Sequence, residues 1–340
     1  MPRLPVTKRF VSTSGARIYR IPCDVLPDLS GRVYLVLGAG PPTLVDTGSG
    51  EERAIRQVLA GLETVRTEFN EPVRPGDIER ILITHAHIDH FGGLWELLRH
   101  TKAEVAVHAL DRRRITAFAE REVLAHHALA RFTKQAGVEP ERQPEVLQAF
   151  AHASGNPRSV PVDFLLGDGE ELDGLRIVHT PGHSPGHVCI AVGNVLLAGD
   201  HILARTVPWL WPESVAAYTG LGHYLDSLDK VLRLDGIEIA LGGHEPPIRD
   251  VPKRIREIRE THLRRLDRVL DILEKAGRPL SVREITEQMY SSQKGFHAML
   301  ALTDVGARVE HLDQRGHLAI ANVDEVDSQP DPVCRYEPAR

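Results

Sequence analysis

The chain has 340 residues, enough for one large domain and a smaller one. Hydrophobic residues make up 42% of it and charged residues 26%, which is ordinary for a soluble globular protein. The net charge of -6 gives no overall basic field that would attract nucleic acid. The first residues lack the apolar core of a signal peptide, no apolar stretch is long enough to span a bilayer, and the three cysteines are widely spaced. These features predict a cytoplasmic protein without a membrane partner.

Apolar runs that end at turn signals predict β-strands through most of residues 1–250. Amphipathic spacing predicts helices over about 51–67 and 220–234, and another helix begins at Leu94. The predicted strands are, in chain order, Arg17–Ile21, Val33–Leu37, Thr43–Asp46, Arg80–Ile83, Glu104–His108, Phe164–Leu166, Leu175–His179, Val188–Val192, Val195–Leu197 and Ile237–Leu241.

Residues from about 110 to 157 differ from the strands on either side. They are rich in Ala, Arg, Glu and Gln at helical spacing, with breaks at two segments that contain glycine and proline. We therefore expect two or three helices inserted into a domain that covers residues 1–250. The insertion is either a solvated helical excursion or a lid over a site, since long insertions often carry binding loops.

The composition changes again in the last 90 residues. A long charged amphipathic helix is expected first, and Ser281 with Glu284 matches the capping box of a second helix. With a third helix and a short strand, residues 251–322 are predicted to form a winged-helix-like domain, followed by a flexible tail over 323–340. This part of the chain has 15 basic and 15 acidic side chains, so it lacks the basic face of a nucleic-acid-binding module. A packing or dimerisation element is the favoured interpretation.

Seven side chains that can bind a metal ion lie at the ends of predicted strands. Four of them follow the strand that ends at Ile83, within six residues of one another; they are His85, His87, Asp89 and His90. The others stand where a strand gives way to a glycine-bounded turn; they are His183, Asp200 and His244. Neutral imidazole is the commonest metal ligand in proteins. A fold that gathers these strand ends on one edge would therefore create a metal site.

Five histidines and two aspartates are more ligands than one tetrahedral ion takes. They fit two divalent ions that share a carboxylate and a solvent molecule. The first predicted ligand set is His85, His87 and His183. The second set is Asp89, His90 and His244, and Asp200 is the shared carboxylate. This mixture of nitrogen and oxygen ligands suits zinc and tolerates manganese or iron.

The chain resembles the metallo-β-lactamase superfamily of hydrolases in five motifs that follow one another in order. These motifs are Leu44-Val45-Asp46-Thr47-Gly48, His85-x-His87-x-Asp89-His90, His183, Asp200 and His244. The resemblance covers about 15–250 and implies an α+β fold, an αββα sandwich of two mixed sheets. The C-terminal helices resemble the subgroup in which a winged helix follows the hydrolase domain, the β-lactamase-like protein 2 and glyoxalase II-like branch. Aspartate at position 200 disfavours a true β-lactamase, because those enzymes have cysteine there.

The resemblance also implies an activity. A hydroxide that bridges the two ions would attack a small acyl substrate, with a thioester favoured over an ester or lactone. Asp89 and Asp200 would serve catalysis as well as metal binding, and Asp46 would orient the metal site. Two alternatives in the same fold stay open. One is an endoribonuclease, and the other is a persulfide dioxygenase with a single iron, in which Asp89, His90 and His244 bind no metal.

Candidate substrate contacts are fewer. Trp209 and Trp211 stand between prolines, which favours either a rigid wall for an apolar acyl chain or packing against the inserted helices. The hydroxyl of Tyr224 could reach a substrate, although core packing is the simpler interpretation. The expected partner is a small acyl compound; nucleic acid is less favoured, and the C-terminal domain could support a homodimer.

Overall fold

The computed structural model describes residues 6–26, 29–290 and 293–339. Its backbone divides into two compact units, which we call unit 1 and unit 2. Unit 1 comprises Met1–Ala119, Asn156–Pro208 and Ser227–Ile255, and unit 2 comprises Glu120–Gly155, Trp209–Asp226 and Arg256–Arg340. Most of the predicted insertion thus belongs to the same unit as the C-terminal residues. The domain boundaries expected from the sequence stay a prediction.

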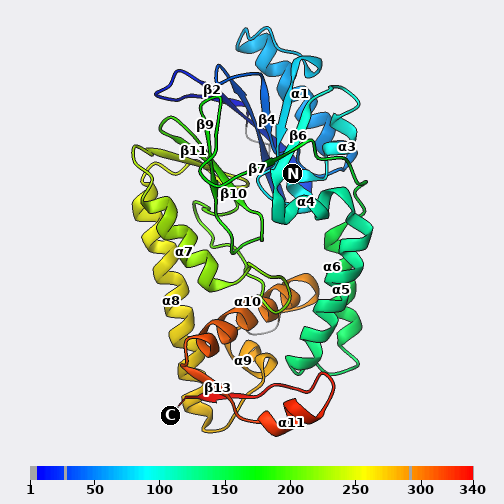
Figure 1. The fold of residues 1–340 in the computed structure, drawn as a ribbon, viewed down its shortest axis with the longest axis vertical. Helices are drawn as coiled ribbons and strands as arrows, with labels where there is room; N and C mark the ends of the chain where they lie inside the picture. The colour runs from blue at the N-terminus through cyan, green and yellow to red at the C-terminus, as the bar shows by residue number, and fades with distance from the viewer. Residues whose placement is uncertain (1–5, 27–28, 291–292, 340) are drawn as a thin grey trace. The chain divides into compact units, whose positions relative to one another are not determined.

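Unit 1 is built on two β-sheets, and strands of both sheets are labelled in Figure 1. The larger sheet has the order β1-β2-β3-β4-β5-β6-β7, and the smaller has the order β12-β11-β10-β9-β8. The strands of the larger sheet are β1 (Lys8–Val11), β2 (Arg17–Leu26), β3 (Leu29–Leu37), β4 (Thr43–Val45), β5 (Arg80–Leu82), β6 (Glu104–His108) and β7 (Phe164–Leu166). Those of the smaller sheet are β8 (Glu171–Leu172), β9 (Leu175–His179), β10 (Val188–Val192), β11 (Val195–Gly199) and β12 (Ile239–Gly242).

Both sheets are mixed. Strands β1 to β4 pair antiparallel, whereas β4 to β7 pair parallel. In the smaller sheet, β8 to β11 are antiparallel and β12 joins β11 in parallel. Parallel neighbours end at the same edge of a sheet. The loops that follow β4, β5 and β6 therefore emerge together, which places the sequence motifs after these strands at one edge.

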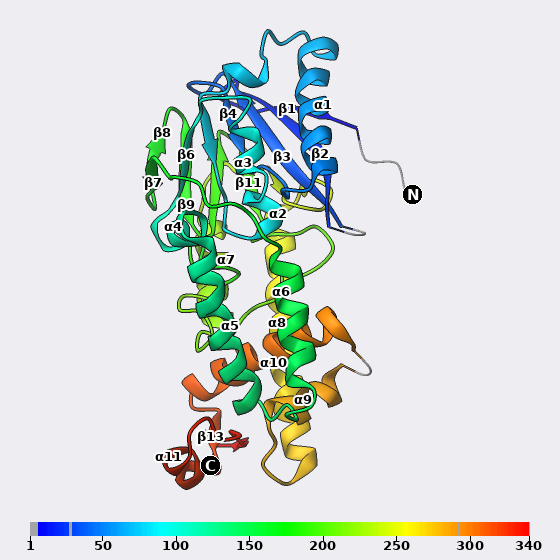
Figure 2. The ribbon, with the colours of Figure 1, turned by 90° about the vertical axis from the view of Figure 1, so that its right-hand side faces the viewer.

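Two apolar layers hold unit 1 together, because alternate residues of a strand face opposite sides of its sheet. One face of the larger sheet, with Ile18 and Val36, packs against Ile190 and Leu197 of the smaller sheet. The other face packs against α1 (Glu52–Glu68), which runs along it in Figure 2. Two mixed sheets face to face with an outer helix confirm the predicted α+β sandwich.

The other helices are short around the strand-end loops and longer elsewhere. They are η1 (Pro75–Asp77, a 3-10 turn), α2 (Ile88–Phe91), α3 (Leu94–Leu97), α4 (Ala109–Thr116), α5 (Phe118–Gln135), α6 (Gln143–Ser154), α7 (Leu221–Leu232), α8 (Val251–Ala276), α9 (Val282–Met289), α10 (Gly295–Gln314) and α11 (Val323–Ser328). In unit 2, α10 packs against α6 and α9. The predicted capping box is present at α9, where Ser281 and Glu284 each accept the other's backbone N–H. A winged helix stays a prediction.

The last residues of unit 2 differ from the expected flexible tail. They contain α11 and β14 (Tyr336–Pro338), which pairs with β13 (Leu318–Ile320). Tyr336 also exchanges two backbone hydrogen bonds with Leu280, and Cys334 is buried. Polar composition predicts a flexible tail, but backbone pairing to two partners orders this segment.

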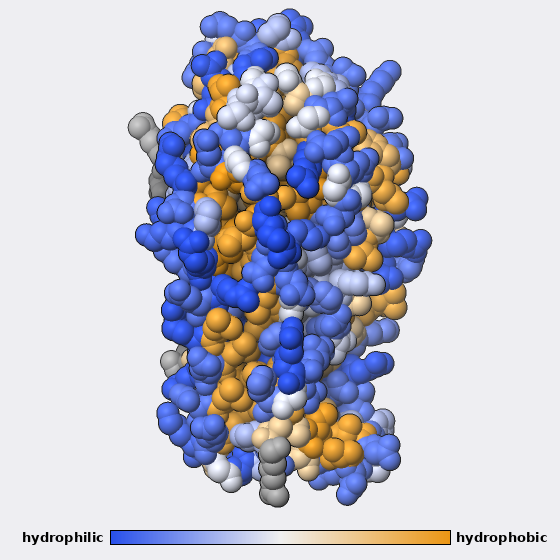
Figure 3. All heavy atoms as spheres, turned by 60° about the vertical axis from the view of Figure 1, so that its left-hand side comes forward, coloured by the Kyte–Doolittle hydropathy of each residue, from blue (hydrophilic) through white to orange (hydrophobic). Residues whose placement is uncertain are grey.

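The surface carries interspersed polar and apolar side chains. Hydrophilic residues cover most of the face in Figure 3, with hydrophobic patches between them. Among the described residues, no helix combines the length and the apolar character that a membrane crossing requires.

Candidate metal centre

The loop after β5 carries four of the predicted ligands, and its neighbour after β4 holds it in place. The backbone N–H of Thr47 donates to the carbonyl of His90 over 2.7 Å. A Cβ added at Gly92 would lie 2.9 Å from the backbone nitrogen of Gly50, and one at Gly93 would collide with the carbonyl oxygen of Thr47. The paired glycines therefore let two strand-end loops pack backbone to backbone.

The first predicted ligand set is gathered at one point. Nδ1 of His87 lies 3.0 Å from Nε2 of His85 and 3.1 Å from Nε2 of His183. One nitrogen from each of these histidines lies within 4.8 Å of the other two. Bonds of about 2.0–2.1 Å from a tetrahedral zinc ion to nitrogen separate its ligand atoms by about 3.3 Å. The three nitrogens are thus spaced as a shared ion requires.

The tautomers of two of the histidines follow from their partners. The hydroxyl of Thr84 donates to Asp46 over 2.8 Å, so it can only accept from Nδ1 of His85, 3.1 Å away. Nδ1 of His90 lies 2.8 Å from the same carboxylate, to which it donates. Both rings therefore carry their proton on Nδ1, and the lone pair on Nε2 faces the other predicted ligands.

The second predicted set lies beside the first. Nε2 of His244 is 3.4 Å from Nε2 of His90 and 3.3 Å from Asp89. Nδ1 of His244 donates to the carbonyl of Ser30 over 3.2 Å, which again turns Nε2 toward the other ligands. Asp89, His90 and His244 also offer atoms within 4.8 Å of one another.

Asp200 lies between the two sets. Its carboxylate is 3.2 Å from His244, 3.5 Å from His90 and 3.8 Å from His183. One oxygen, Oδ1, is buried and accepts no hydrogen bond from the described residues. A buried carboxylate oxygen without a donor is costly unless a cation compensates it, so this orphaned oxygen fits a metal ligand.

The charges of the site also favour cations. Burial lowers the pKa of His85 well below its usual value and that of His87 to about 3, which leaves their lone pairs free to bind a metal. Burial alone would lower the pKa of His244 as well, but the carboxylates of Asp200 and Asp89 raise it to about 10. Aspartates that pull protons onto an imidazole attract a metal ion in the same way. Residues in both sets therefore fit divalent ions.

Gly243, next to His244, lies where a side chain would collide with the predicted ligands. A Cβ at Gly243 would stand 2.5 Å from Oδ1 of Asp200 and 2.6 Å from Cε1 of His90. Gly243→Ala is expected to displace both groups and to weaken zinc binding by about tenfold or more. Competition with a zinc chelator measures the change, and Gly76→Ala serves as the control, because a Cβ at this glycine would meet only the carbonyl oxygen of His100, 3.7 Å away. Equal zinc affinity in the Gly243→Ala variant and the wild type would contradict this packing argument.

Comparison with known proteins agrees with this geometry. Residues 26–270 match the metallo-beta-lactamase superfamily. The chain belongs to this superfamily. Membership confirms the resemblance drawn from the five motifs, and it confirms the predicted enzyme class, a metal-dependent hydrolase.

Relatives in this superfamily match along most of the chain. A beta-lactamase-like protein 2 homolog of Caenorhabditis elegans is 26% identical, with 85% of this chain and 80% of the relative covered. An atrochrysone carboxyl ACP thioesterase of Aspergillus chevalieri is 24% identical over 84% of this chain and 81% of its own. Among solved structures, a metallo-beta-lactamase family protein from Thermus thermophilus is similar, with 29% identity, a TM-score of 0.68, and coverage of 94% of this chain and 98% of that one.

Two buried side chains hydrogen-bond to the loops of the predicted ligands and are not among the predicted site residues. His187 accepts the backbone N–H of Asp200 at Nε2 over 3.1 Å, and its Nδ1 donates to Thr180 over 2.8 Å. It thereby joins the loop of His183 to Asp200. The other is Asp111, in the first turn of α4, whose carboxylate accepts backbone N–H groups from two ligand loops. Its place just after the parallel strand β6 is the one sequence signal that could have singled it out.

The three predicted substrate residues lie in unit 2 rather than among the residues of the superfamily's metal motifs. The ring centroid of Trp209 is 6.0 Å from that of Tyr290, and the ring of Trp211 is 5.8 Å from Phe150. Tyr224 is fully buried, with its ring 5.1 Å from that of His262. Each of these ring contacts is to a residue of the same unit, and a contact with substrate stays a prediction.

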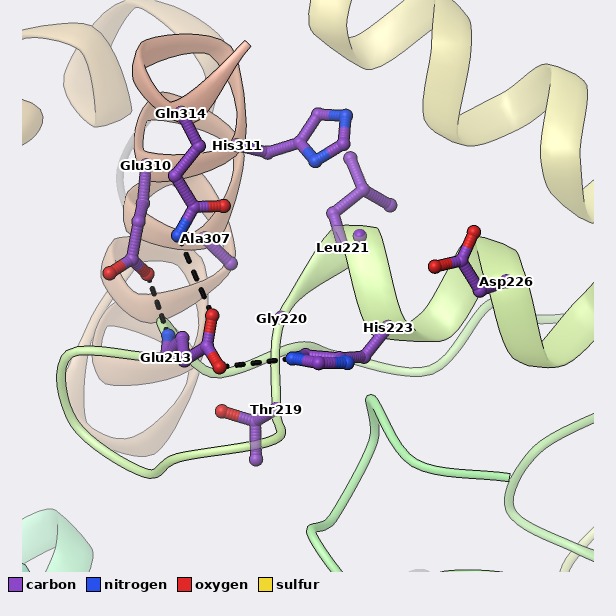
Figure 4. A pocket seen from close by; sticks show the side chains of 11 residues that line it. Glu213, Thr219, Gly220, Leu221, His223, Asp226, Ala307, Glu310, His311 and Gln314 are labelled. Atoms are coloured by element: carbon purple, nitrogen blue, oxygen red, sulfur yellow. Dashed lines mark hydrogen bonds and ion pairs between the residues drawn. The ribbon is translucent and has the colours of Figure 1, made fainter. Parts of the chain in front are cut away.

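A pocket of about 170 Å³, lined mostly by polar residues of unit 2, is drawn in Figure 4. His223 at the start of α7 pairs with Glu213 over 2.9 Å, and Glu310 of α10 accepts the backbone N–H of Glu213 over 2.6 Å. His311 and Asp226 line other parts of the pocket. None of the predicted metal ligands or substrate residues is among its lining residues.

Proposed function

We propose that the chain is a dinuclear metal-dependent hydrolase that cleaves a small acyl substrate. The observation that carries the proposal is the position of Asp200, whose carboxylate is 3.2 Å from His244 and 3.8 Å from His183. These histidines belong to different predicted ligand sets, so a carboxylate between them can serve two ions. Zinc is the ion that we propose for both positions, since mixed nitrogen and oxygen ligands suit it.

We assign a separate role to each residue of such a site. Two divalent ions, when bound, lower the pKa of a water molecule and polarise an acyl carbonyl. Asp46 and the carbonyl of Ser30 hold the imidazoles of His90 and His244 in the tautomer that presents Nε2. Asp89, which lies 3.3 Å from His244, would accept a proton during hydrolysis.

A thioester is the substrate class that we propose. The Aspergillus chevalieri relative named as an ACP thioesterase supports this choice, because its match covers most of both chains. The balance of 15 basic and 15 acidic side chains in the last 90 residues favours a small acyl compound over nucleic acid. We propose that the enzyme works in the cytoplasm.

Elemental analysis and a substrate panel test the proposal together. The purified protein is expected to contain two divalent ions per chain and to hydrolyse thioesters faster than lactones, phosphodiesters or RNA. A single bound iron would contradict the dinuclear site and favour a persulfide dioxygenase. Cleavage of RNA with binding that weakens steeply as salt rises would favour an endoribonuclease instead.

A further inference from the structure

Asp111 is a buried carboxylate that joins two of the ligand loops. It is 4% exposed and lies in the first turn of α4, directly after β6. Its Oδ2 accepts the backbone N–H of Ala86 over 2.8 Å, and its Oδ1 accepts the backbone N–H of Gly186 over 2.9 Å. The hydroxyl of Ser184 donates to Oδ2 over 3.3 Å. All three donors belong to unit 1, as does Asp111.

The donors stand next to predicted metal ligands. Ala86 lies between His85 and His87, and Ser184 directly follows His183. One carboxylate thus ties together the backbone segments that carry all three histidines of the first set. His87 and His183 are 96 residues apart in the sequence, so neighbouring residues cannot fix the distance between the two segments.

The contact is built closely. A Cβ at Gly186 would stand 2.6 Å from Cγ of Asp111 and 2.8 Å from its backbone nitrogen, so this loop needs glycine to approach α4. Burial raises the pKa of the Asp111 carboxyl, because the charged form loses its hydration. Hydrogen bonds from two backbone groups and one hydroxyl compensate that loss. Asp111 offers no atom to the groups of possible metal ligands found among the described residues.

We infer that Asp111 is a positioning residue, which sets the distance between the His85–His87 loop and His183 and thereby the affinity of the first ligand set for its ion. The inference rests on the metal binding in the proposed function but not on the substrate. Asparagine at this position keeps one oxygen acceptor and turns the other atom into a donor that opposes a backbone N–H. One of the two loops then loses its tether.

Asp111→Asn is expected to weaken zinc binding by about 10–100-fold, the usual effect of losing a partner that orients metal ligands. Competition with a chromogenic zinc chelator on the full chain measures this affinity without any substrate. Glu71→Gln is the matched control, because Glu71 is another buried carboxylate of unit 1 that bonds Tyr19 and Arg17 and touches no ligand loop. The control is expected to lower the melting temperature and to leave zinc affinity unchanged.

Ser184→Ala provides a second test of the positioning role if Asp111→Asn does not fold. It removes only the hydroxyl donor, and a loss of about threefold in zinc affinity is expected. If both variants fold and bind zinc like the wild type, the positioning role is wrong. If only Ser184→Ala folds, wild-type zinc affinity in that variant has the same consequence. An equal loss of zinc affinity in Glu71→Gln would overturn it too, because any buried carboxylate would then have the same effect. A wild-type chain that binds no zinc would overturn the proposed function, and the inference would fall with it.

Discussion

Replacing Asp200 by alanine is expected to remove metal from both ligand sets and to stop hydrolysis. Its carboxylate lies within 3.8 Å of histidines from each set, and its buried Oδ1 has no hydrogen-bond donor among the described residues. Turnover is expected to fall by about a thousandfold or more, which corresponds to about 4 kcal/mol of transition-state stabilisation. Elemental analysis and initial rates with a thioester, measured on the same preparation, check both effects.

Two variants make the result specific. Asp200→Asn keeps the volume of the side chain but lacks its charge, so it is expected to lose metal almost as fully as Asp200→Ala. Asp77→Ala removes an exposed aspartate that only caps a short turn in unit 1, and it is expected to keep full metal and rate. Full activity with two ions retained in Asp200→Ala would refute the bridging role.

Strands buried in the sheets could be predicted well from the sequence, because both of their faces are apolar. β6 and β10 have the predicted bounds, Glu104–His108 and Val188–Val192. β1 and β8 escaped prediction for the opposite reason. They are edge strands whose side chains are mostly exposed, so no apolar pattern marks them.

The candidate metal ligands could be proposed from the sequence because each follows a strand, and parallel strands end at a common edge. Asp111 follows a strand as well, but nothing local shows what it binds. Its partners are backbone groups 25 and 75 residues away, so only the fold brings them together. Trp209 and Trp211 show that closeness in sequence is not a reliable guide to structure. They follow Asp200 by about ten residues, yet they belong to unit 2 whereas Asp200 belongs to unit 1.

Replacing Asp46 by asparagine is expected to disable the site by reversing a hydrogen bond. Asp46 accepts the backbone N–H and the hydroxyl of Thr84, and it accepts the Nδ1–H of His90, each over 2.8 Å. If the asparagine oxygen keeps the backbone N–H, its amide group donates to Nδ1 of His90 and forces the ring proton onto Nε2. A protonated Nε2 cannot bind a metal ion, so the second ligand set loses a member.

The expected loss is large because the effect is on the tautomer rather than on packing. In a Ser-His-Asp triad the same exchange lowers turnover by about ten-thousandfold, and we expect about a hundredfold or greater loss of zinc affinity here. Asp46 has a backbone φ of 61°, a left-handed conformation that asparagine also tolerates, so stability should change little. Zinc competition and 15N-detected histidine tautomers, measured with the melting temperature, separate the two effects.

Thr84 supplies the matched pair of control variants for this mechanism. Thr84→Ser keeps the hydroxyl that links Asp46 to His85, and it is expected to bind zinc like the wild type. Thr84→Val has the same shape as threonine but leaves Nδ1–H of His85 without its acceptor, so weaker zinc binding is expected. If Asp46→Asn and Thr84→Val both kept wild-type zinc affinity, hydrogen bonds behind the imidazoles would not control which nitrogen faces the ion.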